Sequence, residues 1–317
     1  MDNTHIVEDA TMSLASGRQF VVRRGDSRAV ITEVGAGLRS FSIGGREFLD
    51  TYGLNEVARS SRGQVLIPWP NRIDHGRYTW NGLTEQLPLS ELSRHTAIHG
   101  LTRWMNWQVV NQQFDRLDLG LVLYPQEGYP FTLSLQMTYA LTIRGLECRT
   151  TARNSGMQPL PYGVGHHPYF TIGADVIDVN YLLIPARSYF PTNERLIPIL
   201  PSQSVEGTPF DFRTMHAIND VFMDTGFTDL IPDEDNFTRV KLADPGGSPS
   251  VTVFMDATHQ FLQVYTGDTL PTASERRRGI AIEPYTCATD AFNNGLGLLV
   301  LKPGETFTSM WGITASI

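Results

Sequence analysis

Two adjacent histidines, His166 and His167, are the first candidates for proton transfer. They lie between Gly165 and Pro168 in residues 161–170, with aromatic residues on both sides. Imidazole gives and takes protons near neutral pH, and aromatic side chains offer an apolar surface to a ring-shaped ligand. Successive side chains of an extended chain point to opposite faces, so only one histidine can face a given cleft. We favour His167, and a buried, hydrogen-bonded pair at a strand end is the alternative.

Glu283 is the candidate base. It ends an apolar run at residues 280–282 and precedes Pro284. A carboxyl group in that position is expected to be partly buried, and burial raises its pKa toward the range of a useful general base. The alternative is a structural ion pair with Arg278 or Arg72, which we consider the weaker interpretation.

Three further residues could hold a ligand with many hydroxyl groups. Arg72, which follows the rigid stretch Pro68-Trp69-Pro70, could donate planar, forked hydrogen bonds. His99 precedes a glycine, which permits close approach of a ligand, and Asp220 could bind two hydroxyl groups at once. The alternatives are an exposed arginine near a turn, an ordinary His-Gly pair and an aspartate in a surface turn.

A metal site is the less favoured interpretation of the same residues. His99, His166, His167 and Glu283 could in principle bind zinc. These four contain no His-x-His or His-x-x-x-His pair, and we therefore expect no metal. The arginines at 276–278 are expected to form a solvated loop, with contact to an anionic substituent of a substrate as the alternative.

The elements that must position these residues are strands. Apolar residues recur with period two over residues 117–123 and again over 131–139, on either side of a break at 125–130. This alternation places one apolar face on a core, as in antiparallel sheets. Turn signals at Gly44-Gly45 and Asn81-Gly82 indicate hairpins.

Shorter strand-like runs lie at residues 20–22, 29–31, 38–43, 250–254, 261–265 and 279–283. No stretch of helical periodicity is long enough for a βαβ crossover, and no Gly-rich phosphate loop follows a strand. The sequence therefore predicts an all-β protein, a large antiparallel β-sandwich in one domain over residues 1–317. Residues 1 to about 15 are expected to be loosely ordered.

The composition argues against several partners. A net charge of −8 disfavours nucleic acid and anionic membrane surfaces, and no apolar run could cross a bilayer. The N-terminus carries acids where a secretory signal needs a basic start. Cys148 and Cys287 are far apart and are most simply free thiols, with one distant disulfide as the alternative. We expect a cytoplasmic monomer or homodimer with a small-molecule ligand.

Many short motifs, taken in order, resemble the aldose 1-epimerase (galactose mutarotase) family over nearly the whole chain. The matching pieces are Pro70-Asn71-Arg72-Ile73, His99-Gly100 with Trp107, Asn154-Ser155-Gly156, Gly165-His166-His167-Pro168-Tyr169-Phe170, Thr208-Pro209-Phe210-Asp211-Phe212, Asn219-Asp220-Val221-Phe222, Gln263-Val264-Tyr265-Thr266-Gly267, Glu283-Pro284 and Leu301-Lys302-Pro303-Gly304-Glu305. The motifs Glu283-Pro284-Tyr285-Thr286-Cys287 and Asp290-Ala291-Phe292-Asn293 look most like a bacterial subgroup of broad or unassigned sugar preference.

The resemblance implies a β-supersandwich fold and interconversion of the α and β anomers of a free aldose, without metal or organic cofactor. By the same resemblance Glu283 takes the proton of the anomeric hydroxyl, and His167 protonates the ring oxygen. His99 assists at the ring oxygen or holds a neighbouring hydroxyl. The residues implied to hold the sugar are Arg72, Asp220, Gln263, Tyr169 and Trp69. The doubled histidine is a departure from the pattern, and it leaves the choice between His166 and His167 open.

Two other functions are compatible with these residues. An epimerase for an anionic sugar, such as a phosphorylated or sulfonated hexose, is suggested by Arg94, Arg103 and the arginines at 276–278. A catalytically silent sugar-binding module on the same fold is the third hypothesis. A histidine together with a glutamate disfavours that module, because binding alone needs no acid–base pair.

Overall fold

The longest strands coincide with the segments of strictest alternation. In the computed structural model, which describes residues 13–317, β11 (Arg116–Leu123), β12 (Leu133–Thr142) and β13 (Gly145–Asn154) are antiparallel neighbours. Every second residue of β12 from Leu133 to Leu141 is buried, and most of the residues between them are half-buried. The predicted alternation is therefore confirmed, with its apolar face on the core.

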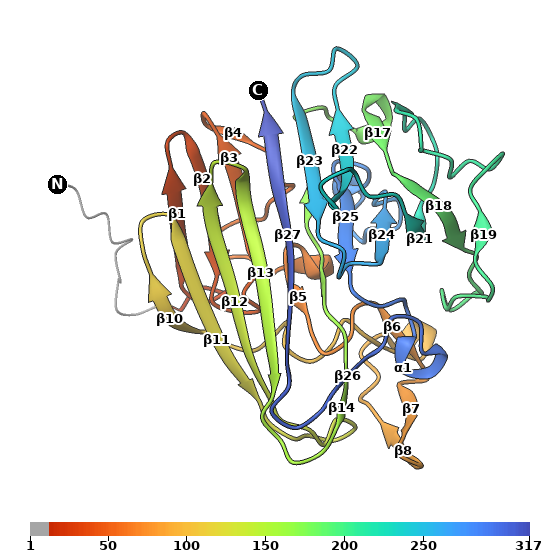
Figure 1. Cartoon of the computed structure of the whole chain (residues 1–317). Coiled ribbons are helices and arrows are strands. Elements are labelled where there is room, and N and C mark those ends of the chain that lie inside the picture. The colour runs from red at the N-terminus through yellow and green to blue at the C-terminus, as the bar shows by residue number, and fades with distance from the viewer. Residues whose placement is uncertain (1–12) are drawn as a thin grey trace.

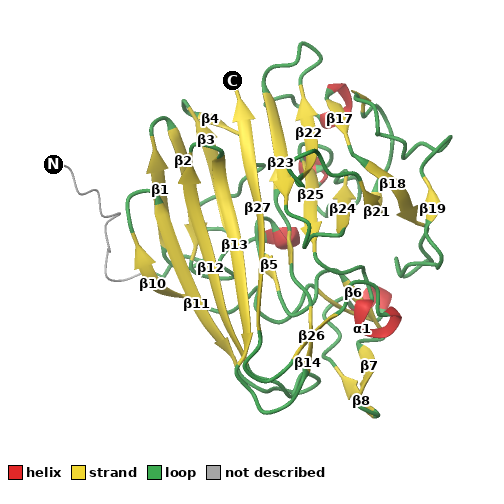
Figure 2. Ribbon diagram, viewed as in Figure 1, coloured by secondary structure: helices red, strands yellow, loops and turns green. Residues whose placement is uncertain are grey.

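Two large antiparallel sheets make up most of the described chain (Figures 1 and 2). Within residues 13–317 the nine-stranded sheet has the order β10 (Gln108–Gln112), β11, β12, β13, β27 (Thr306–Ser316), β23 (Ser250–Met255), β22 (Thr238–Ala243), β17 (Tyr181–Leu183), β20 (His216–Ala217). The eight-stranded sheet has the order β19 (Gln203–Ser204), β18 (Ala186–Phe190), β21 (Asp224–Leu230), β24 (Phe261–Tyr265), β25 (Ile280–Tyr285), β15 (Gly165–His166), β5 (Val65–Leu66), and β16 (Tyr169–Phe170) also pairs with β25.

Smaller sheets and short helices complete the described residues. A four-stranded sheet contains β1 (Gln19–Arg24), β2 (Ser27–Thr32), β3 (Leu38–Ile43) and β4 (Arg46–Glu47). Two-stranded sheets pair β6 (Arg72–Asp74) with β9 (Thr96–Ile98), β7 (Arg77–Trp80) with β8 (Leu83–Gln86), and β14 (Leu160–Tyr162) with β26 (Leu299–Leu301). The helices are α1 (Ala291–Asn294) and the 3-10 turns η1 (Arg59–Ser61), η2 (Leu92–Arg94), η3 (Ile177–Val179) and η4 (Ala273–Glu275).

These elements confirm the all-β prediction and both predicted hairpin turns, at Gly44-Gly45 and at Asn81-Gly82. Both cysteines are free and buried, as the simpler alternative predicts. None of the helices in residues 13–317 has the length and apolar character that crossing a membrane requires. The expectation of loose order for residues 1 to about 15 falls mainly on residues 1–12, which lie outside the described part.

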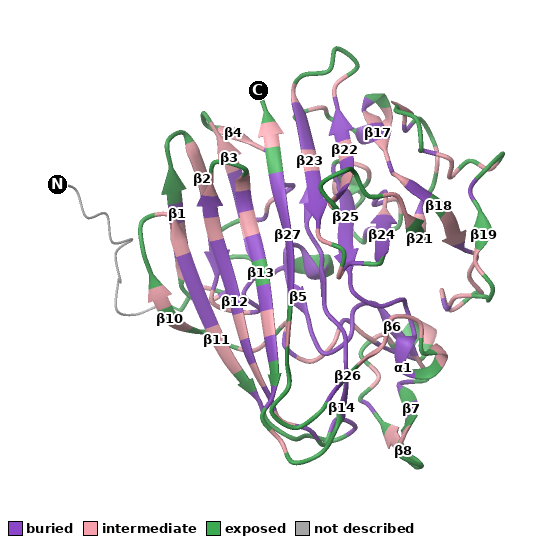
Figure 3. Ribbon diagram, in the orientation of Figure 1, coloured by how far each residue is buried: buried purple, intermediate pink, exposed green. Residues whose placement is uncertain are grey.

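The core lies where the inner faces of the sheets meet. Figure 3 shows buried residues running along β22, β23, β25 and β27, whereas much of β19 and the β7–β8 hairpin is exposed. Trp107, Tyr139 and Trp311 are among the largest fully buried side chains. The hydroxyl of Tyr139 donates to the carbonyl of Ala36, which ties the nine-stranded sheet to the N-terminal segment. The core thus gives the short strands at the edge of the eight-stranded sheet a rigid support.

Candidate active site

A cavity lies over the part of the eight-stranded sheet where β16, β24 and β25 meet. It has about 830 Å³ of space, part of it open to solvent, and we call it the main cavity. Its lining includes Asn71, Arg72, Glu91, Arg94, His99, Arg103, His167, Tyr169, Asp224, Tyr265 and Glu283. A smaller side cavity of about 380 Å³ adjoins it at Asn71, Arg72 and Asp224.

Strand alternation sends the two adjacent histidines to opposite sides. Nε2 of His166 lies 3.2 Å from Oγ1 of Thr150, and its ring lies against Trp311, so His166 faces the nine-stranded sheet. His167 lines the main cavity, and its ring stacks on Tyr169 at a centroid distance of 5.1 Å. The ladder that sets this orientation pairs β15 with β5 and with β25. Of the two imidazoles, only that of His167 is therefore available to a ligand in the main cavity.

Glu283 reaches the same cavity from β25. Its Oε2 lies 3.5 Å from Nε2 of His167, and the hydroxyl of Tyr285 donates to the same oxygen at 2.5 Å. Only 2% of Glu283 is exposed. The alternative of a structural ion pair is wrong for both proposed partners, because Arg72 pairs with Glu91 and Arg278 with Asp50. The carboxyl group is left to interact with His167 and with the cavity.

Burial shifts the proton affinities of this pair in opposite directions. It raises the pKa of the Glu283 carboxyl well above its usual range. A hydrogen bond from Tyr285 opposes this shift, and the negative charge of Asp224 adds to it. It lowers the pKa of the His167 imidazole to about 3, and the positive charges of nearby arginines add to that shift. Both shifts arise because burial disfavours the charged form. Burial therefore favours the uncharged pair, in which the titrating proton is on Glu283 and not on His167.

His99 occupies a left-handed backbone conformation at the cavity wall. Its φ is +64°, and its Nδ1 accepts a hydrogen bond from the backbone N–H of Asn71 at 3.3 Å. That contact assigns the proton of the neutral ring to Nε2. Burial lowers the pKa of His99 well below its usual value, and the neighbouring His167 adds to the shift. The next residue, Gly100, also has positive φ, and a Cβ there would lie 2.1 Å from the carbonyl oxygen of Ile67. Glycine is thus required after His99 by the close approach of the chain to itself.

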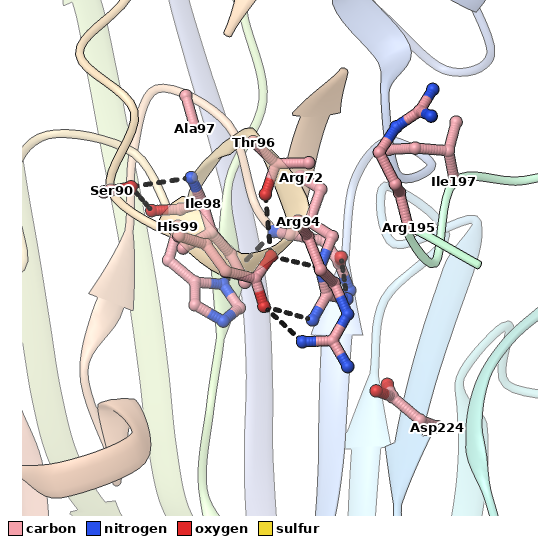
Figure 4. Close-up of polar contacts among 12 residues, drawn as sticks. Arg72, Ser90, Arg94, Thr96, Ala97, Ile98, His99, Arg195, Ile197 and Asp224 are labelled. Carbon is pink, nitrogen blue, oxygen red and sulfur yellow. Dashed lines mark hydrogen bonds and ion pairs between the residues drawn. The ribbon is translucent and has the colours of Figure 1, made fainter. Parts of the chain in front are cut away.

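Arg72 is held by a carboxylate that the sequence did not indicate. Its Nε and Nη2 donate to the two oxygens of Glu91 at 2.8 and 3.0 Å. Arg94 and Thr96 donate to the same carboxylate, and Asp224 extends toward the arginine head groups from the opposite side (Figure 4). The Arg72 guanidinium is thereby fixed in the cavity wall, so its orientation is set before any ligand arrives.

The structure places the other predicted sugar-binding residues in different environments. Tyr169 lines the main cavity, and Gln263 lines the side cavity with its Nε2 donating to Asp224 at 2.7 Å. Trp69 is a core residue, since it is buried and its Nε1 donates to the carbonyl of Ala97. Asp220 is exposed and is not part of the lining of either cavity.

Three functional candidates were missed by sequence reasoning: Glu91, Asp224 and Tyr285. Asp224 begins β21 and lines both cavities, four residues after the exposed Asp220. The hydroxyl of Tyr285 contacts Glu283, and its place two residues away on one strand is a signal that could have revealed it. Glu91 lies in a loop, and no sequence pattern links it to Arg72.

The arginines at 276–278 contact protein groups instead of the main cavity. Nε of Arg276 donates to the carbonyl of Leu270, and Arg277 pairs with Asp178 and Asp268. In residues 13–317 no group of three or more histidine, cysteine, aspartate or glutamate side chains is arranged to hold a metal ion.

Comparison with known proteins points to one family. The family model described as aldose 1-epimerase matches residues 18–314. The uncharacterized protein YihR of Escherichia coli K12 is 33% identical over 301 residues, which cover 94% of both chains. The aldose 1-epimerase of the same organism is 32% identical over 168 residues, covering 51% of this chain and 47% of that one. The crystal structure of a GalM/aldose epimerase homologue from C. elegans superimposes with a TM-score of 0.82 at 15% identity, covering 95% of this chain and all of that one. That likeness confirms the predicted galactose mutarotase-like fold.

Proposed function

The chain belongs to the aldose 1-epimerase family of isomerases, and from that premise we propose that it interconverts the α and β anomers of a free hexose. The observation that carries the proposal is the 3.5 Å contact between Nε2 of His167 and Oε2 of Glu283 in the wall of one cavity. Opening a sugar ring requires one proton to leave the anomeric hydroxyl and another to reach the ring oxygen. Two titratable groups within reach of one ring can do both, and each typically contributes about 10²–10⁴-fold to the rate.

The reaction conserves the single proton of the pair. With the closed sugar bound, Glu283 is ionised and His167 is protonated; Glu283 accepts the anomeric proton while His167 gives its proton to the ring oxygen, and the C1–ring-oxygen bond breaks. The pair is then uncharged, which is the arrangement that burial favours. Rotation about the C1–C2 bond exposes the other face of the aldehyde. Reclosure returns both protons and gives the second anomer.

The charged arrangement must be reached from the uncharged one before the closed ring can open. In this change Glu283 loses one proton and His167 gains one, by exchange with water in the part of the cavity that is open to solvent. Hydrogen bonds from sugar hydroxyls to the Glu283 carboxylate would stabilise the charge that burial disfavours. The neutral His99, with a donor at Nε2, is suited to the ring oxygen or a neighbouring hydroxyl. Arg72 and Asp224 offer donors and acceptors to the remaining hydroxyls, and Tyr169 offers an aromatic wall.

Anomer exchange measured by NMR on a panel of neutral, phosphorylated and sulfonated hexoses tests the proposal. Glu283→Gln should lower the exchange rate by about 10²–10⁴-fold. Glu147→Gln serves as a matched control, because Glu147 lies on β13 and pairs with Arg144, away from both cavities. Native exchange rates in Glu283→Gln would contradict the assignment of the base. Sugar binding by calorimetry with no exchange in the unmodified protein would support the silent binding module instead.

An anionic hexose is the second candidate substrate, and the charges of the main cavity favour it. Arg72, Arg94 and Arg103 all line that cavity in a chain of net charge −8. Arg72 and Arg94 both pair with the single carboxylate of Glu91, whereas Arg103 has no carboxylate within ion-pair distance among residues 13–317. Arg103→Gln should then lower the exchange rate of an anionic hexose and leave that of a neutral hexose unchanged. An unmodified protein that prefers neutral hexoses would exclude this candidate.

A further inference from the structure

The two oxygens of the Glu283 carboxyl group have different surroundings. Oε2 accepts the hydrogen bond of Tyr285 and is the oxygen that lies 3.5 Å from Nε2 of His167. Oε1 accepts no hydrogen bond from residues 13–317. It is absent from the fully buried polar atoms that lack a partner, so it is not fully buried. Glu283 lines the main cavity, so Oε1 is the oxygen left open to a ligand there.

Tyr285 is held rigidly in the position from which it makes this contact. It lies on β25 two residues after Glu283, so both side chains are on the same face of the strand. Gly165 is opposite Tyr285 in the ladder, and a Cβ at Gly165 would lie 2.4 Å from Cδ1 of the tyrosine ring. Phe190 and Phe261 pack with the ring in a small apolar cluster. The ring therefore has little freedom to turn its hydroxyl away from Glu283.

We propose that Tyr285 is a positioning residue that prevents the base and the acid of the site from pairing with each other. Its hydroxyl occupies Oε2, the oxygen nearest to His167, and leaves Oε1 to meet the anomeric hydroxyl of the sugar. This inference rests on the proposed function, because it assigns the direction of a proton transfer within that reaction.

The hydrogen bond from Tyr285 decides which oxygen of Glu283 receives the proton of the sugar. Burial raises the pKa of the Tyr285 hydroxyl well above its usual value, so the hydroxyl stays protonated and remains a donor. The sugar proton then arrives at Oε1, and the reverse transfer leaves from Oε1. Without the hydroxyl, His167 can close the 3.5 Å gap and share the proton with Oε2 directly. The proton would then pass between the two side chains without passing through the sugar.

Several other groups face the Glu283 carboxyl and must be kept constant in a test. Besides Tyr285 on its own strand, the titratable or charged groups around it are His167, Tyr169, His99, Asp224 and Arg72. A substitution of Tyr285 by phenylalanine removes one oxygen atom and retains the ring that fills the apolar cluster. It is therefore the variant that changes the hydrogen bond and leaves these neighbours in place.

Two measurements on Tyr285→Phe in the full chain test the inference. The first is anomer exchange, in which kcat should fall by about 10–100-fold with KM little changed, as for a lost hydrogen bond to a charged group. The second is an infrared titration of the protonated carboxyl band that disappears in Glu283→Gln. Its midpoint should move to higher pH, because the hydrogen bond from Tyr285 lowers the pKa of Glu283. Tyr139→Phe is the matched control, since the buried hydroxyl of Tyr139 donates to the carbonyl of Ala36 outside the site; it should change neither kcat nor the midpoint.

The outcomes separate this inference from the function on which it rests. Native kcat in Tyr285→Phe, or a lower kcat with an unmoved Glu283 midpoint, would overturn the positioning role. An unmodified protein without anomer exchange on any hexose of the panel would overturn the proposed function. In that case the infrared titration still decides whether Tyr285 controls the Glu283 carboxyl, because it requires no turnover.

Discussion

The nine-stranded sheet and the cavity edge of the eight-stranded sheet are built in opposite ways. Strands β11, β12 and β13 are long, regularly paired and alternating. The cavity edge is assembled from two-residue strands, β5, β15 and β16, which pair with neighbours far away in sequence. Four residues that line the main cavity, Ser60, Ser61, Asn71 and His99, have a left-handed backbone conformation.

The difference shows that regular strand structure provides the support, whereas irregular backbone forms the site. Hydrophobic alternation forms the nine-stranded sheet with few special residues, and that sheet supports the cavity edge from behind. At the edge itself the chain adopts strained conformations that bring His99, His167 and Glu283 together. His166 and His167 lie on the border between the two regions, one facing each. They allow the comparison to be tested by substitution.

The largest effect is expected from exchanging these two histidines for glutamine, one at a time. His167→Gln should lower the anomer-exchange rate by about 10²–10⁴-fold, because it removes the candidate acid from the cavity. His166→Gln should lower the free energy of unfolding and leave the rate within a few-fold of native, because His166 contacts Thr150 and Trp311. NMR exchange rates and urea denaturation measure the two quantities. Thr150→Val removes the same hydrogen bond from the other side and should behave as His166→Gln does. A large rate loss in His166→Gln with a native rate in His167→Gln would reverse the assignment.

A smaller effect is expected on the pH dependence of stability. Burial lowers the pKa values of His99, His166 and His167, the last to about 3, so all three stay neutral in the fold, while the unfolded chain protonates them below the ordinary histidine pKa of 6.5. The unfolded state then binds more protons, and the free energy of unfolding falls as pH decreases from 6.5 toward 3. Each histidine contributes up to about 1.4 kcal/mol per pH unit.

Glu283 changes the pH dependence of the free energy of unfolding in the opposite direction and over a different pH range. Its raised pKa favours the neutral form in the fold, so its contribution to stability is lost as pH rises above the ordinary glutamate pKa of 4.5 and through the folded pKa. The free energy of unfolding, measured by urea denaturation at several pH values between about pH 4 and pH 7, should rise with pH less steeply in His166→Gln and more steeply in Glu283→Gln than in the native chain. Equal slopes in all three proteins would contradict the buried neutral states.

The smallest effect is expected from a pair of aspartates four residues apart. Asp224→Asn should weaken sugar binding by about tenfold, since Asp224 lines the main cavity and a hydrogen bond to a charged group contributes roughly 1.5–3 kcal/mol. Asp220→Asn should leave binding unchanged, because Asp220 is exposed outside both cavities. Calorimetric titration with the preferred hexose measures both. Weaker binding in Asp220→Asn alone would restore Asp220 as a sugar-binding residue.

Much of the site could be predicted at the level of residue type. The pattern around Pro168 indicated that one of two histidines would face a cleft, and the end of an apolar strand indicated a buried carboxyl group at Glu283. Trp69 shows the limit of this prediction, because it was expected to hold the sugar, whereas its indole is buried and donates to the carbonyl of Ala97. Asp220 shows it as well, since an aspartate in a turn and one at a strand start look alike in sequence.

The sequence by itself determined the all-β, antiparallel class of the fold and the presence of an imidazole and a carboxyl group in apolar surroundings. Both follow from local rules, because alternation and burial act on neighbouring residues. Only the tertiary structure decided that Glu91 holds Arg72, that Asp224 enters the cavity and that Tyr285 occupies one oxygen of Glu283. Arg72 and Glu91 meet because β6 pairs with β9 at the cavity edge, and Asp224 reaches the cavity because β21 pairs with β24. Such contacts depend on which strands become neighbours and in what register, which is set by the packing of the whole chain.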